Sequence, residues 1–195
     1  MILPDEISPP IPGVVVCHPH PQYGGDMRNS VVVGIIHGLL AQGLAALRFN
    51  FRGAGRSTGT YSEGAGEQED ALASFAALSG HDCIDSKRLA LAGYSFGAGI
   101  VLSVAPHLPK ARGFAVIAPP TQSLSSPNIL SYKKPKLIVA GDMDPFSPRE
   151  DVQVLVGRME GEAHLRILAG ADHFFEGHEN QIGQSVGSFC SSLFI

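Results

Sequence analysis

The sequence predicts an α/β domain built on a doubly wound, mostly parallel β-sheet of about six strands. Short runs of apolar residues alternate with longer segments in which apolar residues recur at helical spacing. Most of the short runs are continuously apolar rather than alternating, as expected of strands that helices cover on both faces. The order has no internal repeat and no linker, so we expect residues 1–195 to form a single domain.

The strands are expected where β-branched and other apolar residues cluster over four to six positions. These runs are residues 14–17, 44–49, 89–92, 114–118, 137–140 and 165–168. Each is too short for a helix and is bounded by polar residues, glycine or proline.

Five helices are expected between and after these strands. A helix over 26–42 ends before Gly43, and one over 67–79 opens on acidic residues and stops at Gly80. The others span 96–107, 148–159 and 178–193; the fourth begins with a proline followed by acids. The connection 119–135 has poor helix propensity, and whether it forms a flap over the domain is left open.

The composition excludes several classes of partner. Lysine and arginine number 14 against 18 acidic residues, for a net charge of −4 with no basic stripe, which argues against nucleic acid and anionic membranes. No apolar run is long enough to span a bilayer, and the first residues lack a basic region and a long apolar stretch. Cys17, Cys83 and Cys190 are widely spread, as in a cytoplasmic protein with reduced thiols. We therefore expect a cytoplasmic location.

Polar residues follow the predicted strands at the sheet edge where such folds bind ligands. Ser95 follows the third run, Asp142 and Asp144 follow the fifth, and His173 follows the sixth. The sequence thus brings a serine, an acid and a histidine to one edge.

Ser95 lies in the segment GYSFG, at residues 93–97. A G-x-S-x-G pattern between a strand and a helix is typical of a nucleophile elbow, in which small neighbours allow a strained serine to protrude. The alternative is a tight strand–helix turn without chemistry, because such a pattern also arises by chance.

A serine nucleophile needs a base, and the base needs an orienting acid. His173 follows the last strand, whereas His164 precedes it and lies at the wrong end. Asp144 is preferred as the acid, because Asp142 directly follows a glycine and could brace the loop instead. The chain order serine, aspartate, histidine is that of α/β hydrolases.

With these residues in place, the chain resembles the α/β-hydrolase superfamily over nearly its whole length. It is most similar to a group of small, lidless bacterial hydrolases through the segments CHPHPQYGGDMRN, LRFNFRGAGRSTG and AGYSFGAGI. The resemblance implies an α/β-hydrolase fold without a large lid, and we expect neither a cofactor nor a metal. It also implies that Ser95 attacks a carbonyl, His173 relays the proton and Asp144 orients the imidazole.

The same resemblance implies an oxyanion hole made of backbone N–H groups. One is that of Phe96, directly after the nucleophile, and the second is assigned to His20, with Tyr23 and Gly24 left open as alternatives. The implied reaction is hydrolysis of a carboxylic ester or thioester of a small-molecule acyl substrate through an acyl-enzyme.

The chain departs from the superfamily at its start. The proline-rich residues before Gly13 are too few for the usual antiparallel pair of strands, so those strands should be reduced or absent. The run 44–49 then becomes a sheet edge, and exposed edges invite pairing. We expect the N-terminal segment or a second subunit, in a homodimer, to cover it.

Four other interpretations compete with hydrolysis of an ester or thioester. A serine peptidase-like enzyme would share the triad, and a non-catalytic binding protein would share the fold. The glycine-rich segment 52–59 suggests an NADP-dependent short-chain oxidoreductase, although no helix N-terminus follows it directly. A metal site on His18 and His20 is disfavoured because the segment lacks a recognised ligand pattern.

Overall fold

A six-stranded, all-parallel sheet forms the centre of the computed structural model, which describes residues 1–5 and 8–195. The spatial order of the strands is β2-β1-β3-β4-β5-β6. The strands are β1 (Ile11–Cys17), β2 (Ala45–Arg48), β3 (Ile84–Tyr94), β4 (Ala111–Ile117), β5 (Lys136–Gly141) and β6 (Ala163–Leu168). The predicted doubly wound sheet is confirmed, and each predicted apolar run contributes a strand.

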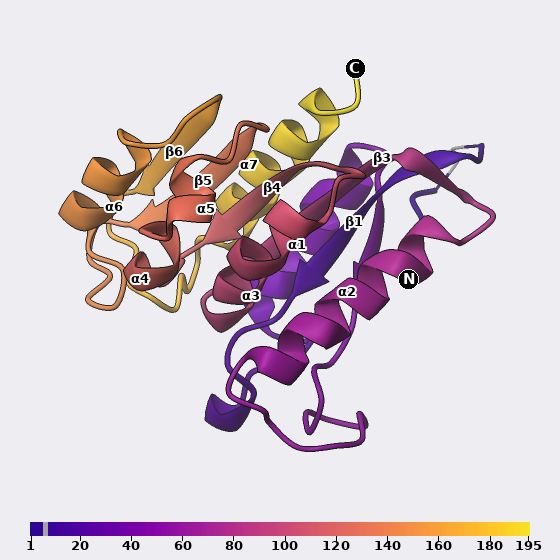
Figure 1. Ribbon diagram of the computed structural model, residues 1–195, viewed down its shortest axis with the longest axis horizontal. Coiled ribbons are helices and arrows are strands. Elements are labelled where there is room, and N and C mark those ends of the chain that lie inside the picture. Colours follow the sequence, from indigo (N-terminus) through magenta and orange to yellow (C-terminus); the bar gives the residue numbers. More distant parts are fainter. Residues whose placement is uncertain (6–7) are drawn as a thin grey trace.

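Helices cover both faces of the sheet (Figure 1). One face carries α1 (Ser30–Ala41) and α7 (Glu179–Ser192), which pack against each other. The other face carries the remaining helices, which are α2 (Ala65–Ser79), α3 (Phe96–Val104), α4 (Thr121–Leu124), α5 (Pro127–Leu130) and α6 (Arg149–Val156).

Successive residues of the continuously apolar strands pack alternately against the helices on one face and on the other. In β1, Val14 and Val16 belong to the core beneath α1 and α7, whereas Val15 and Cys17 belong to the core on the opposite face. All four side chains are fully buried. A strand buried on both faces needs apolar residues at every position, which is why these runs lack polar alternation.

The helix boundaries differ from the predicted ones where side chains cap the chain locally. The helix expected from residue 26 begins at Ser30, because the Asn29 side chain accepts a hydrogen bond from the Val31 amide at 3.0 Å. The helix expected from residue 67 begins two residues earlier, because the buried Glu67 carboxylate accepts the Gly64 amide at 2.8 Å.

The connection between β4 and β5 contains only the four-residue helices α4 and α5. In the part of the chain that the structure describes, no large lid is inserted into the sheet connections. None of the helices in that part has the length and apolarity needed to cross a bilayer.

The β2 edge carries a contact from the start of the chain. Ile2 and Ala46 form an antiparallel bridge, in which each amide donates to the other carbonyl at 2.8 and 3.0 Å. The N-terminal segment therefore lies against this edge, as expected, and pairs with it at one position.

Candidate active site

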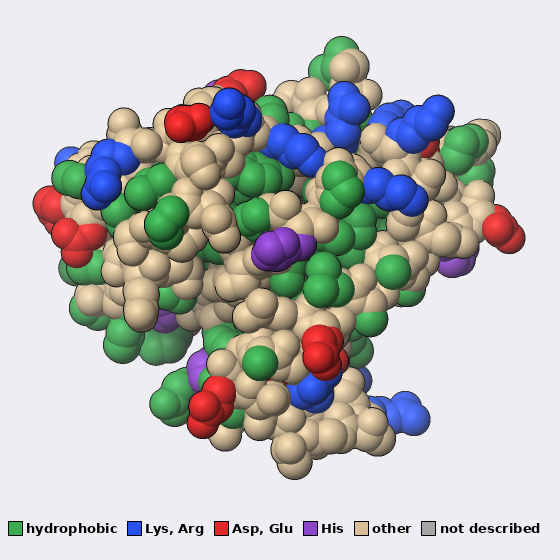
Figure 2. Space-filling model, viewed as in Figure 1, with side chains coloured by type: hydrophobic (Ala, Val, Ile, Leu, Met, Phe, Trp, Pro, Cys, Tyr) green, Lys and Arg blue, Asp and Glu red, His purple; other side chains and the backbone are tan. Residues whose placement is uncertain are grey.

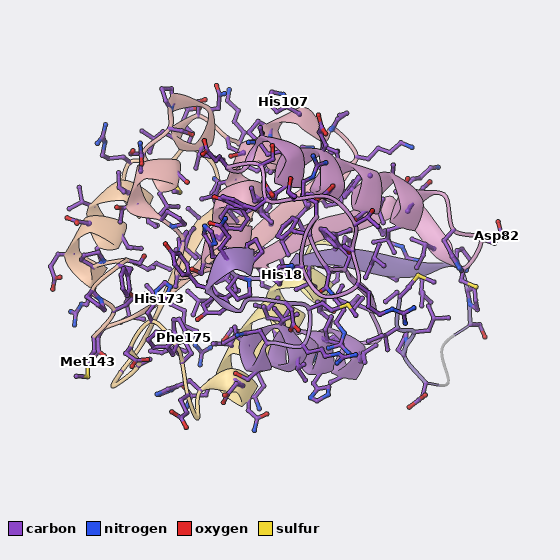
Figure 3. All side chains as sticks on the ribbon, turned by 90° about the horizontal axis from the view of Figure 1, so that it is seen from below. His18, Asp82, His107, Met143, His173 and Phe175 are labelled. Atoms are coloured by element: carbon purple, nitrogen blue, oxygen red, sulfur yellow. The ribbon has the colours of Figure 1, made fainter. Side chains whose placement is uncertain are left out.

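The candidate site lies at the carboxyl ends of β1 and β3, two neighbouring strands whose connections leave in opposite directions along the sheet. The chain runs from β1 outward to β2 and then returns to β3 on the other side of β1. Ligands of doubly wound folds bind at such a switch point. Figure 3, viewed from below, shows His18 and His173 inside the outline, whereas His107 and Asp82 lie at its margins.

Ser95 occupies a sharp turn between β3 and α3. Its backbone is in a left-handed conformation, with φ 55° and ψ −116°. A Cβ atom on Gly97 would lie 2.5 Å from the carbonyl oxygens of Cys17 and His18, and a Cβ on Gly93 would collide with the Gly97 carbonyl. The two glycines are therefore required for α3 to approach β1 and β3 this closely.

The structure joins Ser95, His173 and Asp144 in one chain of hydrogen bonds. Ser95 Oγ lies 2.9 Å from His173 Nε2, and His173 Nδ1 lies 2.8 Å from Asp144 Oδ2. A carboxylate oxygen only accepts, so Nδ1 carries the proton and Nε2 is left to accept from the serine hydroxyl. The three side chains predicted from separate segments thus lie in hydrogen-bond contact.

Asp144 is held rigidly for this contact. It is buried, and its second oxygen, Oδ1, accepts from the amides of Phe146 at 2.8 Å and Ser147 at 3.1 Å. Ser147 Oγ in turn donates to the Pro119 carbonyl at 2.8 Å. Asp142, the other acid of this loop, is exposed and accepts from the Gly170 amide at 2.7 Å, so it braces the histidine loop.

The residues expected to supply the oxyanion hole are neighbours. Phe96 is the first residue of α3, where amides lack a partner within the helix. His20 caps the short helix η1 (Pro21–Tyr23), and its ring lies 4.8 Å from the Phe96 ring between centroids. The Tyr23 and Gly24 amides donate to His20 and Pro21, whereas the His20 amide has no acceptor among the described residues.

The His18 side chain forms hydrogen bonds with backbone groups. Its ring is fully buried, with Nδ1 2.6 Å from the Pro19 carbonyl and Nε2 accepting from the Phe51 amide at 3.0 Å. Burial lowers the pKa of His18, which favours this neutral form. Both nitrogens are therefore occupied, and residues 1–5 and 8–195 contain no cluster of three or more metal-ligating side chains.

The glycine-rich segment 52–59 forms a braced loop. The Arg52 guanidinium donates to Asp70 at 2.8 Å and to Glu69 at 3.1 Å, and the Arg52 amide donates to Asp70 at 2.9 Å. These carboxylates raise the pKa of Arg52 and offset its positive charge. The arrangement leaves this arginine paired with protein carboxylates rather than free for a dinucleotide phosphate.

Sequence reasoning missed Tyr94 and the aromatic residues around the serine. The Tyr94 hydroxyl donates to the His173 carbonyl at 2.7 Å. On the other side, the His20 ring contacts Tyr23 at 4.6 Å and Tyr61 at 4.9 Å between centroids. Figure 2 shows a hollow between the main body of the molecule and a projection below it. In Figure 1, this projection corresponds to η1 and the loop after β2. Only the position of Tyr94 inside GYSFG offered a signal.

The sheet, the strained turn and the hydrogen-bonded residues at its edge define the architecture of an α/β hydrolase. Residues 14–190 match the family Abhydrolase_11, described as an alpha/beta hydrolase domain. An uncharacterized protein of Rickettsia prowazekii is 33% identical over 95% of this chain and 81% of its own length. The chain therefore belongs to the alpha/beta hydrolase family.

Solved structures agree with this assignment. An alpha-beta serine hydrolase homologue from Coxiella burnetii is 34% identical with a TM-score of 0.84, over 95% of this chain and 88% of that one. A Xanthomonas campestris protein, described as an a/b serine hydrolase without lid, is 30% identical with a TM-score of 0.82, over 95% and 84%. These likenesses support hydrolase chemistry and a lidless architecture.

Proposed function

We propose that this protein is a serine hydrolase that cleaves a carboxylic ester or thioester of a small acyl substrate through an acyl-enzyme on Ser95. The observation that carries the proposal is the hydrogen-bonded chain from Ser95 through His173 to Asp144, at 2.9 and 2.8 Å. Serine is a weak nucleophile alone, and this arrangement gives it a base held in the correct tautomer.

In the proposed first step, Ser95 Oγ bonds to the substrate carbonyl carbon while His173 Nε2 takes the hydroxyl proton. The carbonyl oxygen becomes an oxyanion, which the amides of Phe96 and His20 stabilise. His173 then gives its proton to the leaving group as the carbon–oxygen or carbon–sulfur bond breaks.

In the second step, water attacks the acyl-enzyme and His173 takes its proton. The acid is released when the proton returns to Ser95 Oγ. No cofactor or metal enters these steps, and Asp144 stabilises the imidazolium by accepting from Nδ1.

A fluorophosphonate probe with a matched serine control tests the proposal. The wild type should be labelled and should hydrolyse acetate esters, whereas Ser95→Ala should lose both properties and keep its circular dichroism spectrum. Ser103 lies on α3 and donates to the Gly99 carbonyl, so Ser103→Ala should be labelled as the wild type is.

Failure of the wild type to react would favour a non-catalytic binding protein. Ester turnover by Ser95→Ala at the wild-type rate would refute the mechanism. Cleavage of peptide amides in preference to esters and thioesters would instead identify a serine peptidase.

A further inference from the structure

Three exposed apolar side chains lie on the loops that carry Asp144 and His173. Met143 is 66% exposed, and Phe146 and Phe174 are each 67% exposed. We call these three residues the apolar rim. Figure 3 shows Met143 projecting outward beyond His173. Large apolar side chains that are exposed together beside a reactive group can form a binding surface.

Hydrogen bonds connect the two loops that carry the apolar rim. The Met143 amide donates to the Ala171 carbonyl at 3.0 Å, and the Gly170 amide donates to Asp142 at 2.7 Å. The amides of Phe146 and Phe174 are each fixed by an aspartate two residues earlier, at 2.8 and 2.9 Å. These hydrogen bonds fix the backbone from which each phenyl ring projects.

Both phenyl rings lie close to the imidazole of His173, the base proposed above. The Phe146 ring lies 5.0 Å from the His173 ring between centroids, with an interplanar angle of 63°. The Phe174 ring lies 5.9 Å away at 84°. A group that receives a proton from His173 must approach this ring, and both phenyl rings lie beside it.

The charge around the rim restricts what can bind there. Segments 142–147 and 170–176 contain no lysine or arginine and carry the carboxylates of Asp142, Asp144, Asp172 and Glu176, and the nearest lysine or arginine along the chain is the exposed Arg149. A leaving group with a phosphate or carboxylate would meet like charge, and no cation of these segments would offset it.

We propose that the apolar rim is the leaving-group subsite, and that the substrates are esters of uncharged, apolar alcohols. This inference rests on the proposed function, in which His173 donates its proton to the leaving oxygen. The alcohol must then lie beside the His173 ring, and therefore near Phe146 and Phe174. In the same step, the amides of Phe96 and His20 stabilise the oxyanion.

Acetate esters with a constant acyl group and a varied alcohol test the proposal. From methyl to butyl acetate, three methylenes laid on an open apolar surface should raise kcat/KM about tenfold. Benzyl acetate should gain at least as much. An acetate ester of a carboxylated alcohol of butyl length should fall below methyl acetate.

The double variant Phe146→Ser/Phe174→Ser should reduce the butyl-to-methyl ratio to about twofold or less. Val154 is 63% exposed on α6, so Val154→Ser makes a matched change from apolar to polar elsewhere and should keep the wild-type ratio. Circular dichroism checks that both variants fold.

Several outcomes separate this inference from the proposed function. Absence of fluorophosphonate labelling and of all ester turnover would defeat the proposed function itself. Labelling and turnover with a flat alcohol series, or an equal loss of preference in Val154→Ser, would overturn the subsite. A wild-type dimer that the double variant dissociates, with no change in alcohol preference, would show that a second copy covers the rim and would also overturn it.

Discussion

The hydroxyl of Tyr94 donates a 2.7 Å hydrogen bond to the backbone carbonyl of His173. The residue before the proposed nucleophile thus holds the loop that carries the proposed base. Burial, together with the charges of Asp144 and Asp172, raises the pKa of Tyr94, so the hydroxyl remains a donor at neutral and mildly alkaline pH. We infer that Tyr94 is a positioning residue.

Replacing Tyr94 with Phe should lower kcat about tenfold and leave KM within about twofold. The change removes the donor to the His173 carbonyl, at a cost of about 1 kcal/mol in the free energy of unfolding. The rate of fluorophosphonate labelling at Ser95 should fall in proportion to kcat, because both depend on the position of the imidazole.

Tyr132→Phe is the matched control for this variant. Tyr132 is also buried, but its hydroxyl has no hydrogen-bond partner in the described part of the chain. Loss of that hydroxyl should leave kcat and labelling at wild-type values. An equal fall in both variants would reject a positioning role for Tyr94.

A methyl group at Gly97 should disrupt the serine turn. Gly97→Ala places Cβ 2.5 Å from two backbone carbonyls, which cannot move as a flexible side chain can. We expect a loss of about 2–4 kcal/mol in the free energy of unfolding, measured in urea, and a loss of labelling at Ser95.

Gly99, two residues along α3, offers the control. Its Cβ would meet Ser123 Oγ at 3.4 Å and Pro120 beyond that, both of which are ordinary contacts. Alanine favours a helix interior by about 1 kcal/mol over glycine, so Gly99→Ala should retain or raise stability. A similar loss in both variants would contradict the packing argument.

His18 should make the fold sensitive to mild acid. Burial lowers the pKa of His18 in the folded chain, so below about pH 6.5 the unfolded chain binds a proton that the folded chain resists. The free energy of unfolding should therefore fall as pH drops from 7 toward 5, by at most about 1.4 kcal/mol per unit from this group, until the folded pKa is reached.

Urea unfolding of His18→Gln isolates this contribution. Glutamine can accept the Phe51 amide without titrating, so the variant should show a shallower decline than the wild type. His37 is exposed on α1, and His37→Gln should keep the wild-type slope. Identical slopes in all three proteins would count against a role for His18.

The bridge between Ile2 and Ala46 should limit pairing at the β2 edge. Ile2→Pro removes the amide that donates to Ala46, whereas Leu3→Pro leaves both hydrogen bonds of the bridge in place. We expect sedimentation to show more self-association for Ile2→Pro than for Leu3→Pro. A dimeric wild type that neither change affects would instead indicate that a second subunit covers this edge.

The parts of the fold that were predictable are those in which burial dictates residue type. Strand β1 is apolar throughout because helices cover both faces, and the composition of a short segment reveals that. The start of α1 was harder to predict, because Asp26, Asn29 and Ser30 are all plausible caps and only local geometry decides between them.

The site was predictable where chemistry restricts the residue types and their order. Serine, aspartate and histidine follow strands whose ends must meet at one edge, so the proximity of Ser95, Asp144 and His173 could be predicted from the sequence. Contacts through the backbone have no such signature: Tyr94 and the His173 carbonyl are 79 residues apart. Nor does a phenylalanine in a sequence show that it is exposed, as Phe146 is.

The left-handed backbone of Ser95 sets stability against the nucleophilic role proposed for this residue. A non-glycine residue held at φ 55° costs on the order of 1–3 kcal/mol, and glycine would relieve most of that cost. Replacing Ser95 with glycine should therefore raise the thermal unfolding temperature and, at the same time, remove the proposed nucleophile.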